Sequence, residues 1–419
     1  MVALWLTLPV AVQYGIIAVV AAIYGGIVNW AIYSLAYNPR PISPWSSPDP
    51  AAPPRRAVDR IPIVGWWGLR RERQLHGSGF WIRPLLIEFA FSILACGLYY
   101  YETRYGGLLA PQLRDQLDVP GLAHWMHFLF FCHLLLMGLM AAATFIDFDE
   151  QTVPDAITIP GTLLGFALAA HSVEAFLPVS LRHAGGVFLE PVLLTAPGGW
   201  SADWSGTAGL WLGLGLYAGW CFALADRRVI LRRGFRKAVT YFFAGLVRLP
   251  SWRFLLALWV FGSLAILGVW AMGETHWPGL LSSLVGMAVG GGMVWAVRIV
   301  AGTAMAQEAM GFGDVTLMGM IGAFVGWQPT LIAFPLAPMT AILIVVVQYA
   351  LTRNRVVAFG PYLCAGTVVT ILAWDYLWTW YGAPAFALGF ILPVILLGAL
   401  GLMGAMLITW RWLREALFG

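Results

Sequence analysis

Apolar runs of about 20 residues recur along the whole chain, and they constrain its fold more than any other feature. Of the 419 residues, 60% are hydrophobic and only 11% are charged, whereas an ordinary soluble domain carries about 25% charged residues. The pattern predicts an all-α, polytopic membrane protein, a helical bundle of about eleven transmembrane helices. The predicted spans are residues 10–35, 84–101, 123–146, 156–172, 206–225, 254–272, 279–303, 315–327, 330–350, 358–380 and 385–411.

The distribution of arginine and lysine predicts the orientation of these spans. The connections 37–83 and 226–253 are strongly basic, whereas 102–122 and 173–205 are neutral or slightly acidic. Because basic connections stay in the cytoplasm, we expect the N-terminus outside and the C-terminus inside. The first apolar run, 10–35, is too long for the core of a signal peptide, and we expect it to be retained as a span.

Two aspartates stand at the ends of predicted spans that lead to the same side. Asp147 lies at the end of the third span, and Asp314 lies just before the eighth, in the stretch MGFGDVTLM. Two carboxylates held close together cannot both ionise cheaply, so one keeps its proton and the pair titrates as a unit. The ionised carboxylate can then activate water, while the protonated one donates to a scissile carbonyl. The sequence therefore indicates a two-aspartate hydrolytic site, with ordinary helix-end carboxylates as the alternative.

Glycines and the helix dipole bear on this interpretation. Gly311 and Gly313 lack Cβ atoms, so we expect positive φ angles there and room for a substrate backbone to approach Asp314. Asp147 lies at the C-terminal end of a predicted helix, where the helix dipole disfavours negative charge. Helix capping therefore does not explain why an aspartate stands at this position. Farther back, Gly286 and Gly290 are four residues apart, which predicts close helix packing.

Several stretches carry a family resemblance. FIDFDEQTVPDAITIPG, followed later by EAMGFGDVTLMGMIGAFVGW, resembles the type IV prepilin peptidases, which are membrane aspartic proteases of the Gly-x-Gly-Asp kind. AFGPYLCAG, GGIVNWAIYSL and IRPLLIEF match further motifs of that family. The resemblance implies that Asp147 and Asp314 are catalytic. It also implies a supporting active-site loop of Gly311, Gly313, Glu308, Asp155 and Thr316, and the structural or substrate-facing residues Asn29, Glu88, Gly360 and Pro361.

The same resemblance implies an activity, substrates and a location. Such a protein is an aspartic endopeptidase of the bacterial inner (plasma) membrane. It removes the short basic leader of prepilin or pseudopilin precursors at the cytoplasmic face, in type IV pilus or type II secretion systems. The cut falls after a glycine and before an apolar helix that stays in the membrane. Many members also N-methylate the new N-terminus with S-adenosylmethionine. Membrane lipids are the other expected partners, and nucleic acid is not expected.

The chain departs from the family pattern in four ways. The connection 37–83 lacks the family's cysteine pairs, and the four cysteines of the chain are isolated, so no zinc or other metal is expected. S-adenosylmethionine is a cofactor only if methylation is retained. Thr316 stands where a lysine is common, an insertion separates the aspartate blocks, and a last span extends the chain. The predicted regions are 1–101 (N-terminal spans and the basic loop 37–83), 102–172 (first aspartate block), 173–278 (inserted external loop and two extra spans), 279–381 (second aspartate block) and 382–419 (extra C-terminal span and tail).

Other functions fit parts of the pattern. Presenilin-type proteases share Gly-x-Gly-Asp, but they pair it with Tyr-Asp and Pro-Ala-Leu rather than with Ile-Asp. An ion- or proton-coupled transporter is an alternative of another class, with Glu88, Asp147, Glu308 and Asp314 along its path. These carboxylates cluster near one interface, which disfavours a path across the membrane. A catalytically impaired scaffold of a secretion or pilus machine is a third alternative, although both aspartates are present.

Overall fold

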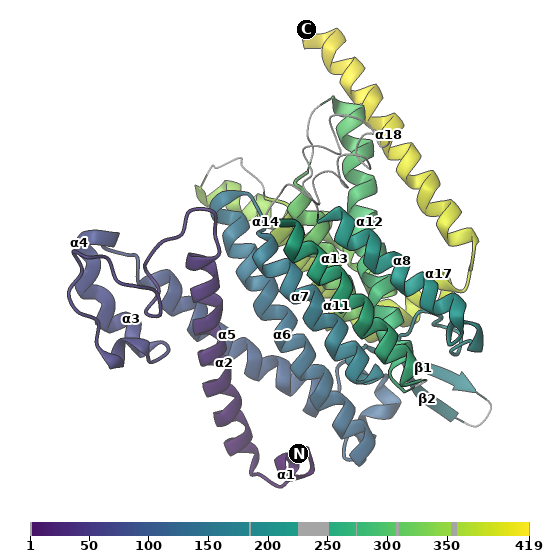
Figure 1. The fold of residues 1–419 in the computed structure, drawn as a ribbon, viewed down its shortest axis with the longest axis horizontal. Coiled ribbons are helices and arrows are strands. Elements are labelled where there is room, and N and C mark those ends of the chain that lie inside the picture. The colour runs from purple at the N-terminus through teal and green to yellow at the C-terminus, as the bar shows by residue number, and fades with distance from the viewer. Residues whose placement is uncertain are drawn as a thin grey trace.

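A computed structural model describes residues 2–183, 186–224, 251–273, 275–306, 310–352 and 358–418. These residues form helices and one two-stranded sheet (Figure 1). The α-helices are α1 (Val2–Leu6), α2 (Val10–Ser34), α3 (Val64–Leu69), α4 (Arg73–His76), α5 (Ile82–Tyr99), α6 (Pro120–Glu150), α7 (Asp155–His171), α8 (Thr207–Ala223), α11 (Ser251–Ala271), α12 (Trp277–Met305), α13 (Phe312–Val325), α14 (Trp327–Thr352), α15 (Gly360–Leu372), α16 (Trp374–Leu377), α17 (Ala383–Phe386) and α18 (Ile391–Phe418). Short 3-10 or π turns are η1 (Ala57–Arg60), η2 (Arg70–Glu72), η3 (Tyr100–Arg104), η4 (Pro111–Gln116), η5 (Val173–Ala175), η6 (Ala202–Trp204) and η7 (Trp378–Gly382).

The helices confirm a polytopic helical membrane protein. Each predicted span overlaps helical structure, and six helices of the described residues are long and apolar enough to cross a membrane. They are Val10–Ser34, Ile82–Arg104, Pro120–Glu150, Arg253–Ala271, Trp277–Met305 and Ile391–Leu417. The predicted number of spans and their orientation stay predictions. Residues 225–250, which hold nearly all of the basic connection 226–253, lie outside the described residues.

The central packing is a close crossing of α12 and α13. A Cβ atom on Gly286 would lie 2.1 Å from the Gly322 carbonyl oxygen, and a Cβ on Gly290 would lie 2.4 Å from the Met318 oxygen. Because these backbones touch, any larger residue at either glycine would push the helices apart. The predicted close packing at Gly286 and Gly290 is therefore confirmed, and it fixes the start of α13 relative to α12.

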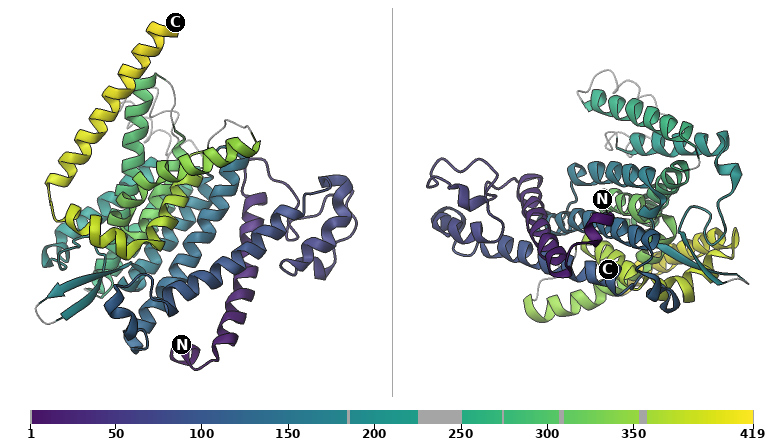
Figure 2. Two further views of the ribbon diagram at one scale, coloured as in Figure 1. Left: turned by 180° about the vertical axis from the view of Figure 1, so that it is seen from behind. Right: turned by 90° about the horizontal axis from the view of Figure 1, so that it is seen from below.

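The largest buried core surrounds this crossing and joins elements distant in sequence. Helix α13 contacts both α7 and α12, and α15 packs on α6 and α14. The core residues of these helices include Met140, Ile146, Leu317, Met320 and Leu363, all nearly inaccessible to solvent. Figures 1 and 2 show α6, α7 and α13 side by side, whereas α18 extends past the bundle along α12. The core thus brings the end of α6 to the beginnings of α13 and α15.

Residues 37–81 form a small lobe between α2 and α5, which we call the basic lobe (Figure 1). The sequence predicts that the Pro- and Arg-rich residues 37–62 are extended and weakly ordered. In the structure they form no α-helix or strand, but ion pairs hold them in place. Arg55 Nε donates to Glu72 Oε1 at 3.0 Å, with both side chains buried, and Arg71 makes two hydrogen bonds to Asp59. These bonds from Arg71 lower the pKa of Asp59. Buried ion pairs from arginines therefore order a segment that has few apolar side chains to bury.

The connection between α7 and α8 is also ordered. Strands β1 (Pro178–His183) and β2 (Gly186–Pro191) pair antiparallel. Trp374 Nε1 donates to the Pro178 carbonyl at 2.7 Å and Trp327 Nε1 donates to the Leu194 carbonyl at 2.9 Å. The hairpin region is thereby fixed to α14 and α16.

Candidate active site

Asp147 lies in the last turn of α6. The amide of Gln151, which has a left-handed φ of 55°, donates to the Asp147 carbonyl at 2.9 Å and ends the helix there. Pro154 then precedes α7, where its fixed φ and missing N–H are tolerated. The Asp147 side chain is almost fully buried, with 5% of its surface exposed.

Asp314 lies in the first turn of α13, with Gly311 as the residue before the helix. The Gly311 amide donates to the Asp314 carboxylate, as expected of an acidic side chain at a helix N-terminus. Asp314 is also buried, with 6% of its surface exposed. Its local fold therefore holds the carboxylate at a fixed place beside the α12–α13 crossing.

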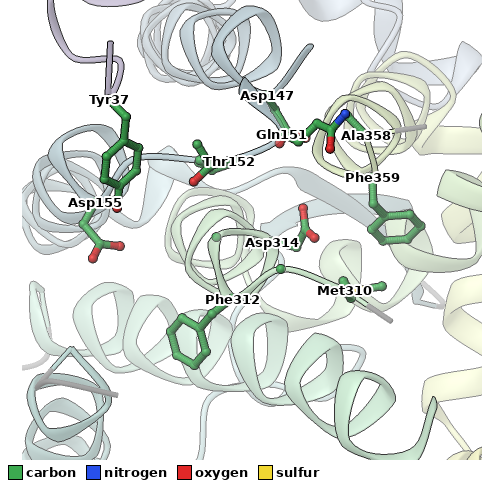
Figure 3. A pocket seen from close by; sticks show the side chains of 13 residues that line it. Tyr37, Asp147, Gln151, Thr152, Asp155, Met310, Phe312, Asp314, Ala358 and Phe359 are labelled. Carbon is green, nitrogen blue, oxygen red and sulfur yellow. The ribbon is translucent and has the colours of Figure 1, made fainter. Parts of the chain in front are cut away.

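Both carboxylates line one cavity of about 270 Å³ (Figure 3). Four separate parts of the chain enclose it, and Asp147 and Asp314 lie in two of them. The two carboxylates are close enough for their negative charges to repel each other. The lining residues are Tyr37, Asp147, Gln151, Thr152, Val153, Asp155, Met310, Gly311, Phe312, Gly313, Asp314, Ala358 and Phe359.

Gly360 explains how a carboxylate is tolerated at the C-terminal end of α6. Its amide, at the beginning of α15, donates to Asp147 Oδ2 at 3.1 Å. The N-terminal end of α15 thus offers a favourable dipole to a group that the dipole of α6 disfavours. A Cβ at residue 360 would lie 2.7 Å from that same oxygen. Pro361, the next residue of α15, is buried and does not line the cavity.

The expectation of positive φ angles at Gly311 and Gly313 is wrong. Gly311 has φ −67°, and Gly313 is a helical residue that is not among the positive-φ glycines. A Cβ on Gly313 would instead lie 2.9 Å from the Val153 nitrogen. The glycine is required because the segment after Asp147 passes directly over the first turn of α13, which keeps the two aspartates together.

Thr316 and Arg298 support the start of α13 from outside the aspartate cavity. Thr316 Oγ1 donates to the Gly313 carbonyl at 3.0 Å. Arg298 of α12 donates from Nε to the Met310 carbonyl at 2.8 Å, and its guanidinium lies 5.7 Å from the Phe312 ring centroid. Sequence reasoning does not single out Arg298, although it is the only charged residue in the span 279–303, which is itself a signal of function.

Of the other predicted site residues, Asp155 lines the cavity, whereas Asn29 and Glu88 do not. Asn29 Nδ2 donates to Glu88 Oε1 at 3.0 Å, and Glu88 also accepts from Trp66 Nε1 and the Ile63 amide. Asn29 and Glu88 therefore hold the basic lobe against α2 and α5. Because Glu88 accepts these three hydrogen bonds and does not line the aspartate cavity, it is not part of the ion path that the transporter alternative requires. Glu308 lies outside the described residues.

Tyr37 is a cavity residue that sequence reasoning missed. It lies just after α2, lines the cavity, and donates its amide to Glu150 Oε2 at 2.7 Å. No sequence signal marks it, because the contact joins the ends of two spans distant in the chain. Across the described ranges, no group of three or more His, Cys, Asp or Glu side chains could hold a metal ion. The predictions about zinc and S-adenosylmethionine stay predictions.

Comparisons with known proteins agree with the motif around Asp314. The model of the "Type IV leader peptidase family" matches residues 248–346, a segment that contains α12, α13 and Asp314 but not Asp147. Similar proteins are prepilin leader peptidase/N-methyltransferases. That of Escherichia coli (strain K12) is 30% identical over 99 residues, which cover 23% of this chain and 44% of the relative. That of Aeromonas salmonicida (strain A449) is 29% identical over 106 residues, 24% of this chain and 35% of the relative.

A third relative, from Dickeya chrysanthemi, is 34% identical over 90 residues, covering 20% of this chain and 30% of the relative. The chain thus spans less than half the length of these curated relatives. No solved structure matches it. The predicted resemblance is confirmed: the segment 248–346, which contains Asp314, is similar to the type IV leader peptidase family.

Proposed function

We propose that this protein is a membrane aspartic endopeptidase that removes the leader of type IV prepilin-like precursors, with Asp147 and Asp314 as its catalytic pair. One observation carries the proposal. Two buried carboxylates, from blocks far apart in the sequence, line one cavity at the ends of membrane helices. The match of the Asp314 segment to leader peptidases supports the choice of peptide hydrolysis over ion transport.

The chemistry follows from the pair. One aspartate is ionised and takes a proton from a water molecule. The oxygen of that water then attacks the scissile carbonyl carbon. The other aspartate is protonated and donates to the carbonyl oxygen, and the C–N bond then breaks as the leaving amine takes up a proton. Because the amides of Gly360 and Gly311 each donate to one carboxylate, either aspartate can carry the negative charge. The roles therefore belong to the pair.

The size of the cavity limits the substrate. A volume of about 270 Å³ is at the low end of ligand pockets, which span about 300–1,000 Å³. It admits a few residues of extended peptide and no folded domain. The scissile bond must therefore lie in an unfolded segment, such as the junction between a leader and the body of a precursor.

The location and partners form part of the same proposal. The multi-pass helical fold supports a membrane position, and the name of the relatives, prepilin leader peptidase, supports prepilin precursors as substrates. The bacterial inner membrane and pseudopilin substrates are the finer part of the proposal. N-methylation of the product with S-adenosylmethionine is a separate and weaker proposal. Mass spectrometry of the processed N-terminus tests it, and a consistently unmethylated product contradicts it.

Leader removal from a co-expressed pilin-like precursor tests the main proposal. The variants Asp147→Ala and Asp314→Ala should each abolish processing. Asp149→Asn is the matched control, because Asp149 lies on α6 two residues after Asp147, pairs with Arg83 at 2.8 Å and does not line the cavity. Processing that persists in either alanine variant rules out the pair.

A further inference from the structure

The surface of the basic lobe carries almost only positive charge. The structure describes every residue of the lobe, which holds three carboxylates. Glu72 is buried and paired with Arg55. Asp59 is buried and paired with Arg71, so only the half-buried Asp49 offsets positive charge at the surface. The exposed arginines of the lobe are Arg40, Arg56, Arg60, Arg70 and Arg73. Pairing inside the lobe thus leaves a cationic surface that favours a negatively charged partner.

Apolar and aromatic side chains are exposed beside these arginines. Val64 and Trp67 of α3 are 59% and 61% exposed, and their spacing of three residues places them on one face of the helix. The guanidinium of Arg70 lies 4.5 Å from the Trp67 ring centroid. The guanidinium of Arg60 likewise lies 5.4 Å from the ring centroid of Trp45, which is also exposed. Tryptophan beside arginine is typical of the membrane interface, where the ring meets acyl chains and the cation meets headgroups.

The lobe reaches back along the two spans that flank it. Trp66 Nε1 of α3 donates to Glu88 Oε1 at 2.8 Å, and Asn29 Nδ2 donates to the same oxygen at 3.0 Å. Glu88 is six residues after Ile82, the first residue of α5. Asn29 is five residues before Ser34, the last residue of α2. The junction therefore lies about 8 Å inside the ends of both helices.

The position of α3 in the fold agrees with this junction. Figures 1 and 2 show α3 beside α2 and α5 rather than beyond the ends of the bundle helices. Both neighbours are long and apolar enough to cross a membrane. Interfacial helices enter a bilayer to a depth of about 5–10 Å, which matches the depth at which Trp66 is held. The cationic and apolar side chains of the lobe thus meet the bilayer at its headgroup layer.

We infer that the basic lobe binds the anionic phospholipid headgroups of the membrane surface, with Val64 and Trp67 entering the boundary between headgroups and acyl chains. A free phosphate or an acidic protein segment would match the arginines alone, whereas a lipid surface also covers the exposed apolar side chains beside the spans. The inference does not depend on the proposed function, because no precursor takes part in it. Tyr37, the first residue of the lobe, lines the aspartate cavity, so the bound lobe holds that cavity close to the membrane surface.

Hydrogen exchange of the full chain in nanodiscs tests the charge of the partner. Nanodiscs of phosphatidylcholine are compared with nanodiscs that also contain phosphatidylglycerol. We expect the lobe amides to exchange at least about fivefold more slowly with phosphatidylglycerol, the effect of about one arginine at an anionic surface. High salt should reduce this difference. Inorganic phosphate added to the phosphatidylcholine nanodiscs should not slow the exchange, which separates a lipid surface from a free anion.

Charge variants locate the effect within the lobe. The double variant Arg60→Gln, Arg70→Gln should lose most of the difference between the two bilayers, because it removes two exposed cations beside the tryptophans. The double variant Arg411→Gln, Arg414→Gln on α18 is the control, because it removes the same charge outside the lobe. The lobe amides of the control should keep the full difference.

Crosslinking tests the depth of α3 without changing an arginine. Photoreactive benzoylphenylalanine replaces Trp67 or, as the control, Tyr37, an exposed aromatic residue of the same lobe that lines the aspartate cavity. In mixed nanodiscs residue 67 should crosslink to lipid, with phosphatidylglycerol in excess of its share of the bilayer, and residue 37 should not. Equal lobe exchange in the two bilayers, equal slowing by inorganic phosphate alone, or crosslinks from residue 67 only to protein would each overturn the inference.

Discussion

The aspartate cavity and the basic lobe both bury carboxylates, but they do so in opposite ways. In the lobe, Glu72 and Asp59 accept hydrogen bonds from Arg55 and Arg71. In the cavity, Asp147 accepts from a backbone amide and its charge repels that of Asp314. A buried carboxylate that is paired with arginine contributes to structure, whereas two carboxylates that line one cavity, with no cationic partner among the described residues, are the arrangement expected of the proposed catalytic pair. Removing a carboxylate should therefore harm folding in the lobe and catalysis in the cavity.

The largest expected effect is on catalysis in the aspartate cavity. Asp147→Asn and Asp314→Asn should each lower kcat/KM for leader removal by at least about a thousandfold, because each removes a general acid or base. Their thermal unfolding temperatures should stay equal to that of the unmodified protein or rise, since charge repulsion is relieved. A large drop in the unfolding temperature of either variant would show that these aspartates stabilise the fold, as the carboxylates of the lobe do.

The second-largest expected effect is the loss of stability when the buried ion pair of the basic lobe is broken. Glu72→Gln leaves the Arg55 guanidinium buried without its anionic partner, which costs about 3–5 kcal/mol. The lobe amides should lose protection in hydrogen exchange, while the cavity helices keep theirs. Asp149→Asn is the control, because its pair with Arg83 is partly exposed and should contribute less than about 1 kcal/mol. Unchanged lobe protection in Glu72→Gln would show that the ion pair does not hold the lobe.

Gly360→Ala should show how strongly the rate depends on the position of the Asp147 carboxylate. The new Cβ would lie 2.7 Å from Asp147 Oδ2, so the carboxylate must shift while both aspartates remain. A displacement of about 1 Å at a reacting group costs about a hundredfold in rate. The rate of leader removal at a saturating concentration of precursor measures this loss. The matched control is Gly268→Ala, where a Cβ meets nothing within 4 Å, and equal rates for the two variants would exclude Gly360 from positioning Asp147.

Arg298 should have a smaller effect, because it acts through the loop that precedes α13. Arg298→Gln loses the charged hydrogen bond to Met310 and the contact with Phe312, which we expect to lower kcat/KM about tenfold. Arg298→Lys should recover part of that loss. Arg411→Gln, on α18, is the control. If Arg298→Gln matches the unmodified protein in rate and in its pH profile, the arginine has no positioning role.

The smallest effect is a pH dependence confined to the lobe. Hydrogen bonds from Arg71 hold the folded pKa of Asp59 below the usual value of 3.8. The resulting stability is fully present above about pH 3.8 and is lost as the pH falls through the lower, folded pKa. Hydrogen exchange of the lobe amides, corrected for the intrinsic pH effect, should show this loss. Asp59→Asn should remove the pH dependence, and an identical profile in that variant would contradict the assignment.

Much of the fold is predictable because its signals are local. Apolar runs locate the helices, and the alternation of basic connections indicates that Asp147 and Asp314 end on one side. The spacing of Gly286 and Gly290 likewise predicts a contact made by consecutive helix turns. Such features depend on residues close together in the sequence, so a pattern can reveal them.

The parts that escape prediction depend on contacts between distant segments. Gly313 is required by the approach of Val153 and not by its own φ angle. The ion pairs of the basic lobe turn a Pro- and Arg-rich stretch into an ordered one. The amide that compensates Asp147 belongs to Gly360, two hundred and thirteen residues further along. Resemblance to a family marks Gly360, but only the fold gives its reason.

The most direct test of the aspartate pair is the rate of leader removal in Asp147→Asn, Asp314→Asn and the double variant, under single-turnover conditions. Two groups that act as one unit lose nearly all catalysis when either is changed. We predict that the double variant is no slower than the slower single variant. Rate losses that multiply would show that Asp147 and Asp314 act independently, and would contradict a shared catalytic site.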